Sequence, residues 1–251
     1  MTLLNSPWIC RKNTMSVVYK NILDSIRVSC ESCGLNSLCI PRGLNENEIE
    51  KLDISITHKT ILRQGDTLYK QNSIFTGLYA VKSGALKIIN INELGEESVV
   101  GIFLPGEIVG FDGFSSDKHQ CTVSALETSH VCKIQLDEIQ EAIPNIYKQL
   151  LKHASNFIND TQAKNSLIKT SAEKRIIAFL LDLSKRHNER GYSAFDFNLY
   201  LSRSNIANLL HLSPETVSRT LRNLERTHLI KLESKRVKIL NMTALTEKNE
   251  V

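Results

Sequence analysis

The sequence has no long apolar run, and this absence limits what the chain can be. Its longest such stretch is about "IIAFLLDL", well short of the roughly 18 apolar residues that a membrane-spanning helix needs. The first residues, "MTLLNSPWICRK", contain no apolar segment of the kind found in signal peptides, so we expect neither secretion nor a transit sequence. We therefore expect a cytoplasmic protein with no membrane partner, and its 251 residues suffice for one large domain or two ordinary ones.

The sequence also lacks the common motifs of enzymes. It has no G-x-S-x-G nucleophile turn, no G-x4-G-K-[ST] phosphate loop and no H-E-x-x-H zinc motif. The 7 histidines are scattered, and no two of them have the spacing of a metal site. Since no catalytic set is visible, the chain is not expected to be an enzyme.

Arginine is absent between Arg63 and Arg175, and charge is unevenly distributed along the chain. Residues 171–251 carry 14 Lys and Arg against 9 Asp and Glu, whereas residues 43–170 carry 12 against 16. A basic C-terminal third beside an acidic middle indicates that the C-terminal part meets a polyanion such as nucleic acid.

Cysteine is scarce, but it is clustered. Of the 6 cysteines, Cys30, Cys33 and Cys39 fall within the stretch "CESCGLNSLC". In a reducing compartment, clustered cysteines more often bind a metal or perform redox chemistry than form structural disulfides. Soft thiolates suit both tetrahedral zinc and iron–sulfur clusters, and the spacing alone leaves these two alternatives nearly even.

Residues 60–135 show the pattern of short strands broken by turns. The stretch "LYAVKSGALKIININELGEESVVGIFLPGEIVGF" alternates apolar and polar residues, and glycines interrupt it at the intervals of a compact β-barrel or sandwich. An all-β module is therefore predicted, preceded by a short helix in "PRGLNENEIEKLD".

After Pro144 the apolar period changes to that of a long helix. Residues on one face step by four and three, the heptad spacing of a coiled-coil seam: Tyr147, Leu151, Ala154, Ile158, Thr161, Asn165 and Ile168. We prefer a homodimer seam for this set, and a helix that packs only on its own domain is the alternative. Because Ala154, Thr161 and Asn165 are small or polar, the dimer is expected to be weaker than a leucine-rich one.

A second apolar set lies on a neighbouring face of the same helix. Ile146, Leu150 and Phe157 are expected to pack on the β module. The helix thus has two sides to bury.

The C-terminal third contains two short helices joined by a tight turn, in "LSRSNIANLLHLSPETVSRTLRNLERTHLI". Ser202 can cap the first helix, and Ser213 can cap the second, which has Pro214 at its first position and Glu215 in its first turn. This is the helix-turn-helix plan.

The second helix has one apolar and one charged face. Its buried stripe is predicted to be Val217, Leu221 and Leu224. The opposite face carries the charged residues Glu215, Arg219, Arg222 and Arg226. Such a face can simply be solvated, with Glu215 and Arg219 forming an ordinary ion pair, but in a basic helix-turn-helix module the arginines are placed to reach base edges in a major groove. The following stretch "HLIKLESKRVKIL" predicts a hairpin wing whose basic residues, Lys231, Lys235, Arg236 and Lys238, can contact phosphate.

The order of these parts resembles the catabolite activator and fumarate–nitrate regulator superfamily of bacterial transcription factors. The resemblance implies an α+β fold with an N-terminal double-stranded β-helix (jelly-roll) sensor domain of the cyclic-nucleotide-binding type, a long dimerisation helix and a C-terminal winged helix-turn-helix. The expected domains are 1–42, an arm with the cysteine loop; 43–140, the sensor; 141–170, the dimerisation helix; and 171–251, the DNA-binding domain.

One branch of this superfamily binds cyclic nucleotides with an Arg-Ser or Arg-Thr pair that follows the Gly-Glu of a turn. Gly106 and Glu107 are present here, but His119, Gln120 and Cys121 stand where the pair is expected. A buried phosphodiester without a guanidinium partner would lose its strongest contacts. No cyclic nucleotide is therefore expected, and Gly106 and Glu107 are expected to serve the turn alone.

The other branch comprises FNR-type oxygen-responsive regulators, which carry an N-terminal C-x2-C-x5-C and a distant fourth cysteine. "CESCGLNSLCIP" and "ALETSHVCKI" resemble both parts, so the resemblance implies Cys30, Cys33, Cys39 and Cys132 as ligands of a 4Fe-4S cluster. Cys10 and Cys121 have no counterpart. The resemblance also implies that the intact cluster favours a DNA-binding homodimer, and that oxygen converts the cluster to a 2Fe-2S form and releases the dimer.

The same resemblance implies how the second helix reads DNA. The family's E-x-x-S-R corresponds to Glu215, Ser218 and Arg219, with Arg219 donating to guanine, Glu215 accepting from an amino group of cytosine or adenine, and Ser218 contacting thymine in a TTGAT-type palindromic site. The candidate DNA-binding set also includes Ser213, Thr216 and Arg222.

Two exposed turns, at Gly95 and near Thr128, correspond to patches with which such regulators contact RNA polymerase. A cyclic-nucleotide-responsive or zinc-responsive transcription factor with the same DNA-binding half remains the alternative function.

Overall fold

The N-terminal half of the chain forms a two-sheet β-roll in the computed structural model, which describes residues 29–56, 59–139 and 143–250. The roll (residues 59–134) consists of the strands β1 (Lys59–Leu62), β2 (Thr67–Tyr69), β3 (Leu78–Ser83), β4 (Leu86–Ile91), β5 (Glu97–Phe103), β6 (Ile108–Val109), β7 (Thr122–Ala125) and β8 (Ser129–Ile134), with a short 3-10 turn at Phe111–Gly113. Its two sheets have the orders β1-β8-β3-β6 and β2-β7-β4-β5, with antiparallel neighbours.

The two faces of each strand have different neighbours, as the alternation in the sequence predicts. On β8, Val131 is fully buried in the cluster between the sheets, whereas the adjacent Cys132 points to the other face and packs beside α2 (Glu46–Ser55). This alternation decides which side of the roll receives the sulfur of Cys132.

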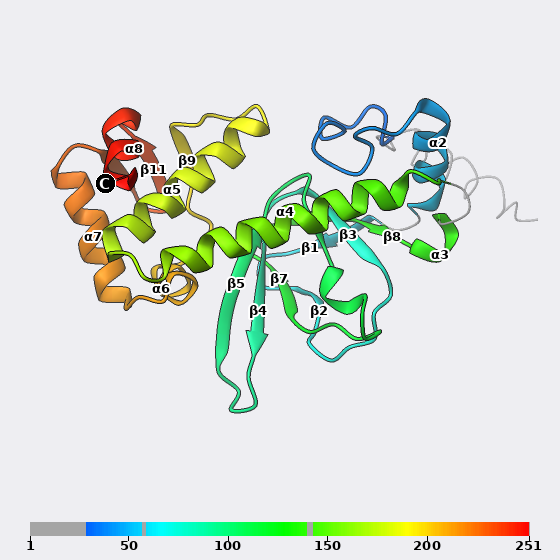
Figure 1. Cartoon of the computed structure of the whole chain (residues 1–251), viewed down its shortest axis with the longest axis horizontal. Coiled ribbons are helices and arrows are strands. Elements are labelled where there is room, and N and C mark those ends of the chain that lie inside the picture. Colours follow the sequence, from blue (N-terminus) through cyan, green and yellow to red (C-terminus); the bar gives the residue numbers. More distant parts are fainter. Residues whose placement is uncertain (1–28, 57–58, 140–142, 251) are drawn as a thin grey trace, which may run out of the picture.

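Three helices flank the roll. Asn45 and Glu48 form a reciprocal capping box that begins α2, and the short α3 (Leu136–Ile139) follows β8. The long α4 (Ile146–Leu167) then runs along the molecule from the α2 end to the C-terminal domain (Figure 1). None of the helices in the described ranges is both long and apolar enough to cross a bilayer.

The inner face of α4 packs as expected. Ile146 and Leu150 are buried in the cluster that also contains Leu52 of α2, and Phe157, although 37% exposed, stacks on Phe103 of β5 at a ring-centroid distance of 5.7 Å. The prediction that this apolar set packs on the β module is confirmed.

The C-terminal domain, called the reading head below (residues 172–250), contains the expected winged helix-turn-helix. Its elements are α5 (Ala172–Glu189), β9 (Asp196–Asn198), α6 (Arg203–Leu210), α7 (Pro214–Arg226), β10 (Ile230–Glu233), β11 (Arg236–Ile239) and α8 (Met242–Glu250). The side chains of Ser202 and Ser213 accept hydrogen bonds from the backbone N–H groups of Asn205 and Thr216, so both predicted caps are confirmed. The wing has a third strand, β9, in the order β10-β11-β9.

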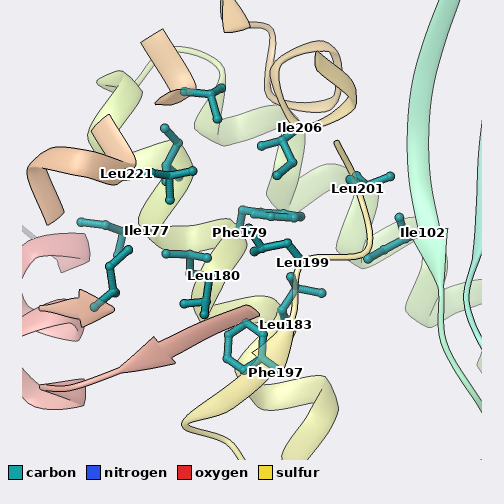
Figure 2. Packing of buried hydrophobic residues seen from close by; sticks show 14 of the residues in the cluster. Ile102, Ile177, Phe179, Leu180, Leu183, Phe197, Leu199, Leu201, Ile206 and Leu221 are labelled. Carbon is teal, nitrogen blue, oxygen red and sulfur yellow. The ribbon is translucent and has the colours of Figure 1, made fainter. Parts of the chain in front are cut away.

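The reading head and the roll share one hydrophobic core. Val99, Ile102 and Leu104, at or beside β5, belong to the same buried cluster as the interior of the head. Figure 2 shows Ile102 facing Leu201 across this boundary. Because apolar surface is buried on both sides, the head is packed against its own roll rather than tethered by a linker.

We predict that Leu180→Ala, at the centre of this shared core, lowers the free energy of unfolding by about 2 to 5 kcal/mol because it leaves a cavity. Leu94→Ala is the matched control, since Leu94 is 83% exposed at the tip of the β4–β5 hairpin, and it should change stability by less than about 0.5 kcal/mol. Denaturant unfolding checks both, and equal midpoints for the two variants would contradict the burial of Leu180 in this core.

Candidate cysteine site and nucleic-acid interface

The cysteine loop (residues 29–43) is held by hydrogen bonds to itself and to α2. Within the loop, the N–H of Cys39 donates to the carbonyl of Leu35 at 2.8 Å and the N–H of Asn36 donates to that of Cys33 at 3.0 Å. The N–H of Cys30 donates to a carboxylate oxygen of Asp53 on α2 at 3.1 Å. These bonds fold the loop back on itself beside α2.

Two residues of α4 contact the end of the loop. The imidazole of His153 lies near the backbone of Cys39, and this proximity partly offsets the lowering of its pKa by burial. A Cβ at Gly43 would lie 2.8 Å from Nε2 of Gln149, and the φ of Gly43 is +84°, so the close approach and the turn both require glycine. The loop is therefore packed against the helix that carries the predicted seam.

The four predicted ligands line one cavity. Cys30, Cys33 and Cys39 come from the loop, and Cys132 comes from the middle of β8. The other lining side chains are mostly apolar and come from the loop, α2, β3 and β8: Leu35, Ile40, Pro41, Leu52, Ile56, Ala80, Val81 and Ile134, with Asn36 and Lys82 as polar members. The fold thus brings the distant cysteine of the roll to the three of the loop.

The cavity makes two of these thiols, Cys30 and Cys39, weaker acids than usual. Burial raises the pKa of Cys39 to about 12, with further contributions from Cys132 and Cys33. Burial raises the pKa of Cys30 even more, and Asp53, Cys39 and Cys132 add to the effect. Without a metal these two thiols are protonated, so a metal that binds them must displace their protons.

The four thiols of the cavity are soft ligands, which suit a soft metal group. Over residues 29–56, 59–139 and 143–250, no three His, Cys, Asp or Glu side chains are grouped so that they could hold one metal ion. Structural zinc requires its ligands to converge on a point, whereas each thiolate of a cubane meets a different iron. Four soft sulfurs spread around one apolar cavity suit an iron–sulfur cubane.

The exposed face of α7 is available for a ligand. Val217, Leu221 and Leu224 are buried, as predicted, whereas Glu215 and Arg219 are exposed. In the described part of the chain no ion pair joins Glu215 to Arg219.

The remaining candidate residues lie on the same helix or at its start. Arg222 is exposed and Ser218 is half-buried. The hydroxyl of Ser213 caps the helix and lies 3.0 Å from that of Thr216, so these two residues form the N-terminus of α7.

Arg175 of α5 was not identified from the sequence, yet it holds the helix-turn-helix together. Its Nη1 donates to the carbonyls of Leu210 at 2.9 Å and His211 at 3.0 Å, and its Nε donates to that of Thr170 at 3.1 Å. It satisfies the carbonyls that α6 leaves unpaired at its C-terminus and ties them to the segment before α5. The only signal in the sequence is that Arg175 ends the long arginine-free stretch.

The basic residues of the wing are partly neutralised within the protein. Lys231 and Lys238 both pair with Glu233, at 2.8 Å and 3.4 Å, and Arg236 pairs with Asp196. These exposed pairs are weak and can exchange for phosphate contacts.

In the roll, His119 is the first of the three residues that stand where the phosphate-binding pair is expected, and it belongs to an aromatic stack. His119 is 1% exposed and stacks on Tyr69 with ring centroids 3.6 Å apart. Asp112 accepts hydrogen bonds from the hydroxyl of Tyr69 and from the N–H groups of Gln120 and Cys121. The acceptor that faces this stack is a carboxylate, which would repel a phosphate.

The expectation that Gly106 and Glu107 serve the turn alone is wrong. Glu107 accepts hydrogen bonds from Arg186 at 2.6 Å and from Arg190 at 2.5 Å, both on α5 of the reading head. The partners lie far along the chain, so the local Gly-Glu pattern could not show this role.

The predicted seam lies on the outer side of α4, with one exception. Leu151 and Ile158 are exposed by 69% and 54%, and Asn165 is also exposed. Ala154 and Thr161 are half-buried, and Ile168 caps the C-terminus of the helix. Tyr147 packs partly against the molecule's own core, so it is the least available member of the set.

The two turns with a proposed polymerase role are both at the surface. Gly95 is at the tip of the β4–β5 hairpin with a φ of +80°, and Thr128 is exposed in the turn between β7 and β8. Cys121 is half-buried in the roll away from the cavity, and Cys10 lies outside the described residues.

Comparison with known proteins decides the family. Residues 59–145 match the model of the cyclic nucleotide-binding domain, and residues 174–248 match that of the Crp-like helix-turn-helix domain. The chain is 37% identical to the fumarate and nitrate reduction regulatory protein of Vibrio cholerae, over 88% of this chain and 90% of that protein. It is 39% identical to the transcriptional activator protein Anr of Pseudomonas protegens, over 84% and 88%.

The chain belongs to the Crp/Fnr family of transcription regulators. The structure of FixK2 from Bradyrhizobium japonicum shares the fold, with a TM-score of 0.69 and 20% identity over 76% of this chain and 96% of that one. Membership of the Crp/Fnr family confirms the expected α+β fold and a DNA-binding regulator rather than an enzyme.

We predict that Arg175→Ala lowers stability by about 1.5 to 3 kcal/mol, because it leaves carbonyls at the end of α6 without their charged donor. DNA affinity should fall with it, since α6 and α7 lose their fixed angle. Lys169→Ala, an exposed neighbour in the same segment, should leave both properties unchanged. Thermal unfolding and a DNA-binding titration check this, and wild-type values for Arg175→Ala would refute the role of this arginine.

Proposed function

We propose that the protein is an oxygen-sensing global transcriptional regulator that activates or represses its promoters according to the state of a 4Fe-4S cluster held by Cys30, Cys33, Cys39 and Cys132. The observation that supports this most strongly is that these cysteines, three from a loop and one from a strand, line a single cavity. Relatives that cover most of the chain are named as anaerobic or fumarate and nitrate reduction regulators, which supports the same function.

A bound 4Fe-4S cluster would link the cysteine loop covalently to β8. Oxygen would convert this cluster to a 2Fe-2S form and so weaken the link. With the loop held, its contacts to His153 and Gln149 keep the N-terminal half of α4 in one position on the roll. The seam on the outer face of α4 then pairs with that of a second copy.

The seam itself supports a dimer that is close to balance with its monomers. Leu151, Ile158 and Ile168 supply apolar surface, while Thr161 and Asn165 weaken the seam. A switch requires such balance, because a ligand can shift an equilibrium only by its differential affinity for the two states.

In the proposed DNA complex the N-terminal part of α7 enters the major groove of each half of a TTGAT-type palindrome. Arg219 donates to guanine, Glu215 accepts from a base amino group, and Ser218 contacts thymine. Arg222 and the helix N-terminus at Ser213 and Thr216 lie beside these residues and face phosphate. Two linked heads bind far more tightly than one, because the second contact is intramolecular.

We propose the same domain limits as from the sequence: the arm at 1–42, the sensor at 43–140, the dimerisation helix at 141–170 and the DNA-binding domain at 171–251. The turns at Gly95 and Thr128 are proposed to contact RNA polymerase, since both are exposed. The absence of a cyclic nucleotide is also proposed, and it is supported by the buried stack of His119 on Tyr69. The zinc alternative is weakened because no grouping for a single ion exists among the described side chains.

We predict that protein purified without oxygen contains about four iron and four acid-labile sulfide per chain. Serine variants of Cys30, Cys33, Cys39 and Cys132 should each lose this content, whereas Cys121→Ser, the matched control away from the cavity, should keep it. Operator binding should fall when air is admitted to the wild type. Zinc without sulfide, or equal DNA binding before and after air, would overturn the proposal.

We predict that Arg219→Ala weakens binding of the operator by about 1 to 3 kcal/mol and relaxes preference at the guanine. The control is Arg226→Ala, because Arg226 lies at the C-terminal end of α7, where it hydrogen-bonds Asn223. Titrations against operators altered at one base pair check the contact, and unchanged selectivity in Arg219→Ala would refute it.

A further inference from the structure

A partly buried ionic cluster joins the turn between β5 and β6 to the reading head. Oε1 of Glu107 accepts from Nε of Arg186 at 3.0 Å and from Nη2 of Arg190 at 2.5 Å, and Oε2 accepts from Nη2 of Arg186 at 2.6 Å. We call these three residues the Glu107 fork. The side chains of Arg186 and Arg190 are only 12% and 4% exposed and that of Glu107 is 27% exposed, so the fork is partly shielded from solvent and salt.

The two arginines also bind the backbone of the same turn. Arg186 donates to the carbonyl of Ile102 at 2.9 Å, and Arg190 donates to that of Pro105 at 2.7 Å. On the other side, the N–H of Leu104 donates to Glu107 at 3.0 Å. The guanidinium groups are planar and their donors have fixed directions, so this set of bonds specifies one orientation of α5 against the turn.

The charges of the fork depend on one another. Burial alone would raise the pKa of Glu107. The positive charges of Arg186 and Arg190 lower it by more than burial raises it, so the pKa of Glu107 lies below its ordinary value. Asp182 gives Arg186 a second partner at 3.3 Å. Such buried pairs contribute modestly to net stability, and their attested use is to select one geometry over others.

A second polar contact holds the head at the other end of β5. Asn208 of α6 accepts from the N–H of Val99 at 2.5 Å and donates to the carbonyl of Glu97 at 2.9 Å. Since β5 is the edge strand of its sheet, the side-chain amide takes the place of a neighbouring strand. The head is thus fixed at two separated points, with the shared apolar core between them.

These contacts fix more than the head alone. The roll also holds the inner face of α4, so the orientation of α7 relative to the seam on α4 is set by the two attachments. In a dimer formed through that seam, the distance between the two α7 helices is then a fixed length, and half-site spacing on DNA follows from that length.

We infer that Glu107, Arg186, Arg190 and Asn208 are positioning residues that fix the reading head on the roll and thereby set the half-site spacing that the protein accepts. The inference about half-site spacing rests on the proposed function as a homodimer on palindromic DNA. The inference that these residues fix the head on the roll is independent of that function.

The test uses the full-length protein, purified without oxygen, and two variants, Glu107→Gln and Asn208→Ala. Operators carry two half-sites with the preferred spacer, with spacers one base pair longer or shorter, or a single half-site. Wild type should prefer one spacer by at least tenfold. In each variant the preference should fall to within about threefold while single half-site affinity stays within about twofold, because α7 itself is untouched.

Hydrogen exchange provides a readout that needs no dimer. Glu107→Gln should speed exchange of the Val99 amide, at the opposite attachment point, by at least fivefold. Glu189→Gln is the matched control, since Glu189 is an exposed residue of α5 outside the fork, and it should change neither spacing preference nor exchange. Asn208→Ala keeps the inference testable if Glu107→Gln does not fold.

The outcomes separate the two proposals. Wild-type spacing preference and wild-type exchange in Glu107→Gln and Asn208→Ala would overturn the positioning role. If the wild-type protein binds all spacers and the single half-site with equal affinity, the proposed homodimer on palindromic DNA is wrong. In that case only the exchange rate of the Val99 amide in Glu107→Gln tests whether the fork fixes the head.

Discussion

The packing of the cysteine loop into the corner between the roll, α2 and α4 is the constraint on which the rest of the structure depends. One side of the loop faces Cys132 on β8, another contacts Gln149 and His153 of α4, and a third meets the turn after β5. There, a Cβ at Gly106 would lie 2.8 Å from that of Leu38, and the φ of Gly106 is +89°. The residue after this glycine is Glu107. One segment therefore adjoins the cavity, the seam helix and the attachment of the reading head.

Under the proposed function, this geometry gives the loop two physical routes to DNA. The first would pass through α4 and change whether two copies pair, and the second would pass through the turn and change how each head is held. The two routes differ in how firmly the contacts along them are held. The outer face of α4 offers a few exposed apolar residues, such as Leu151 and Ile158, whereas the head is attached by a shared core and buried ionic bonds. Dimerisation is thus the softer equilibrium, and the one more easily shifted by a loop that is cross-linked or released.

Local patterns in the sequence predicted the elements well where those patterns are periodic. The heptad step located α4, the stripe of Val217, Leu221 and Leu224 located α7, and Ser202 and Ser213 marked two helix starts. Cys132 was found only through a family resemblance, since a single cysteine in a strand is most often a small buried residue. The roles of Glu107, Arg175 and Asn208 were missed because their partners are distant in the chain, and no spacing rule connects an edge strand to a side-chain amide on α6. The short strand β9 was missed for the same reason, since it exists only through its pairing with β11.

Sedimentation velocity of one oxygen-free sample, repeated after air is admitted, tests the central claim most directly. The account predicts a dimer when iron and sulfide are bound and a monomer after their loss, while Cys132→Ser sediments as a monomer in both conditions. A single unchanged species in the wild type, with or without oxygen, would contradict the claim that the cysteine cavity controls pairing of the chain.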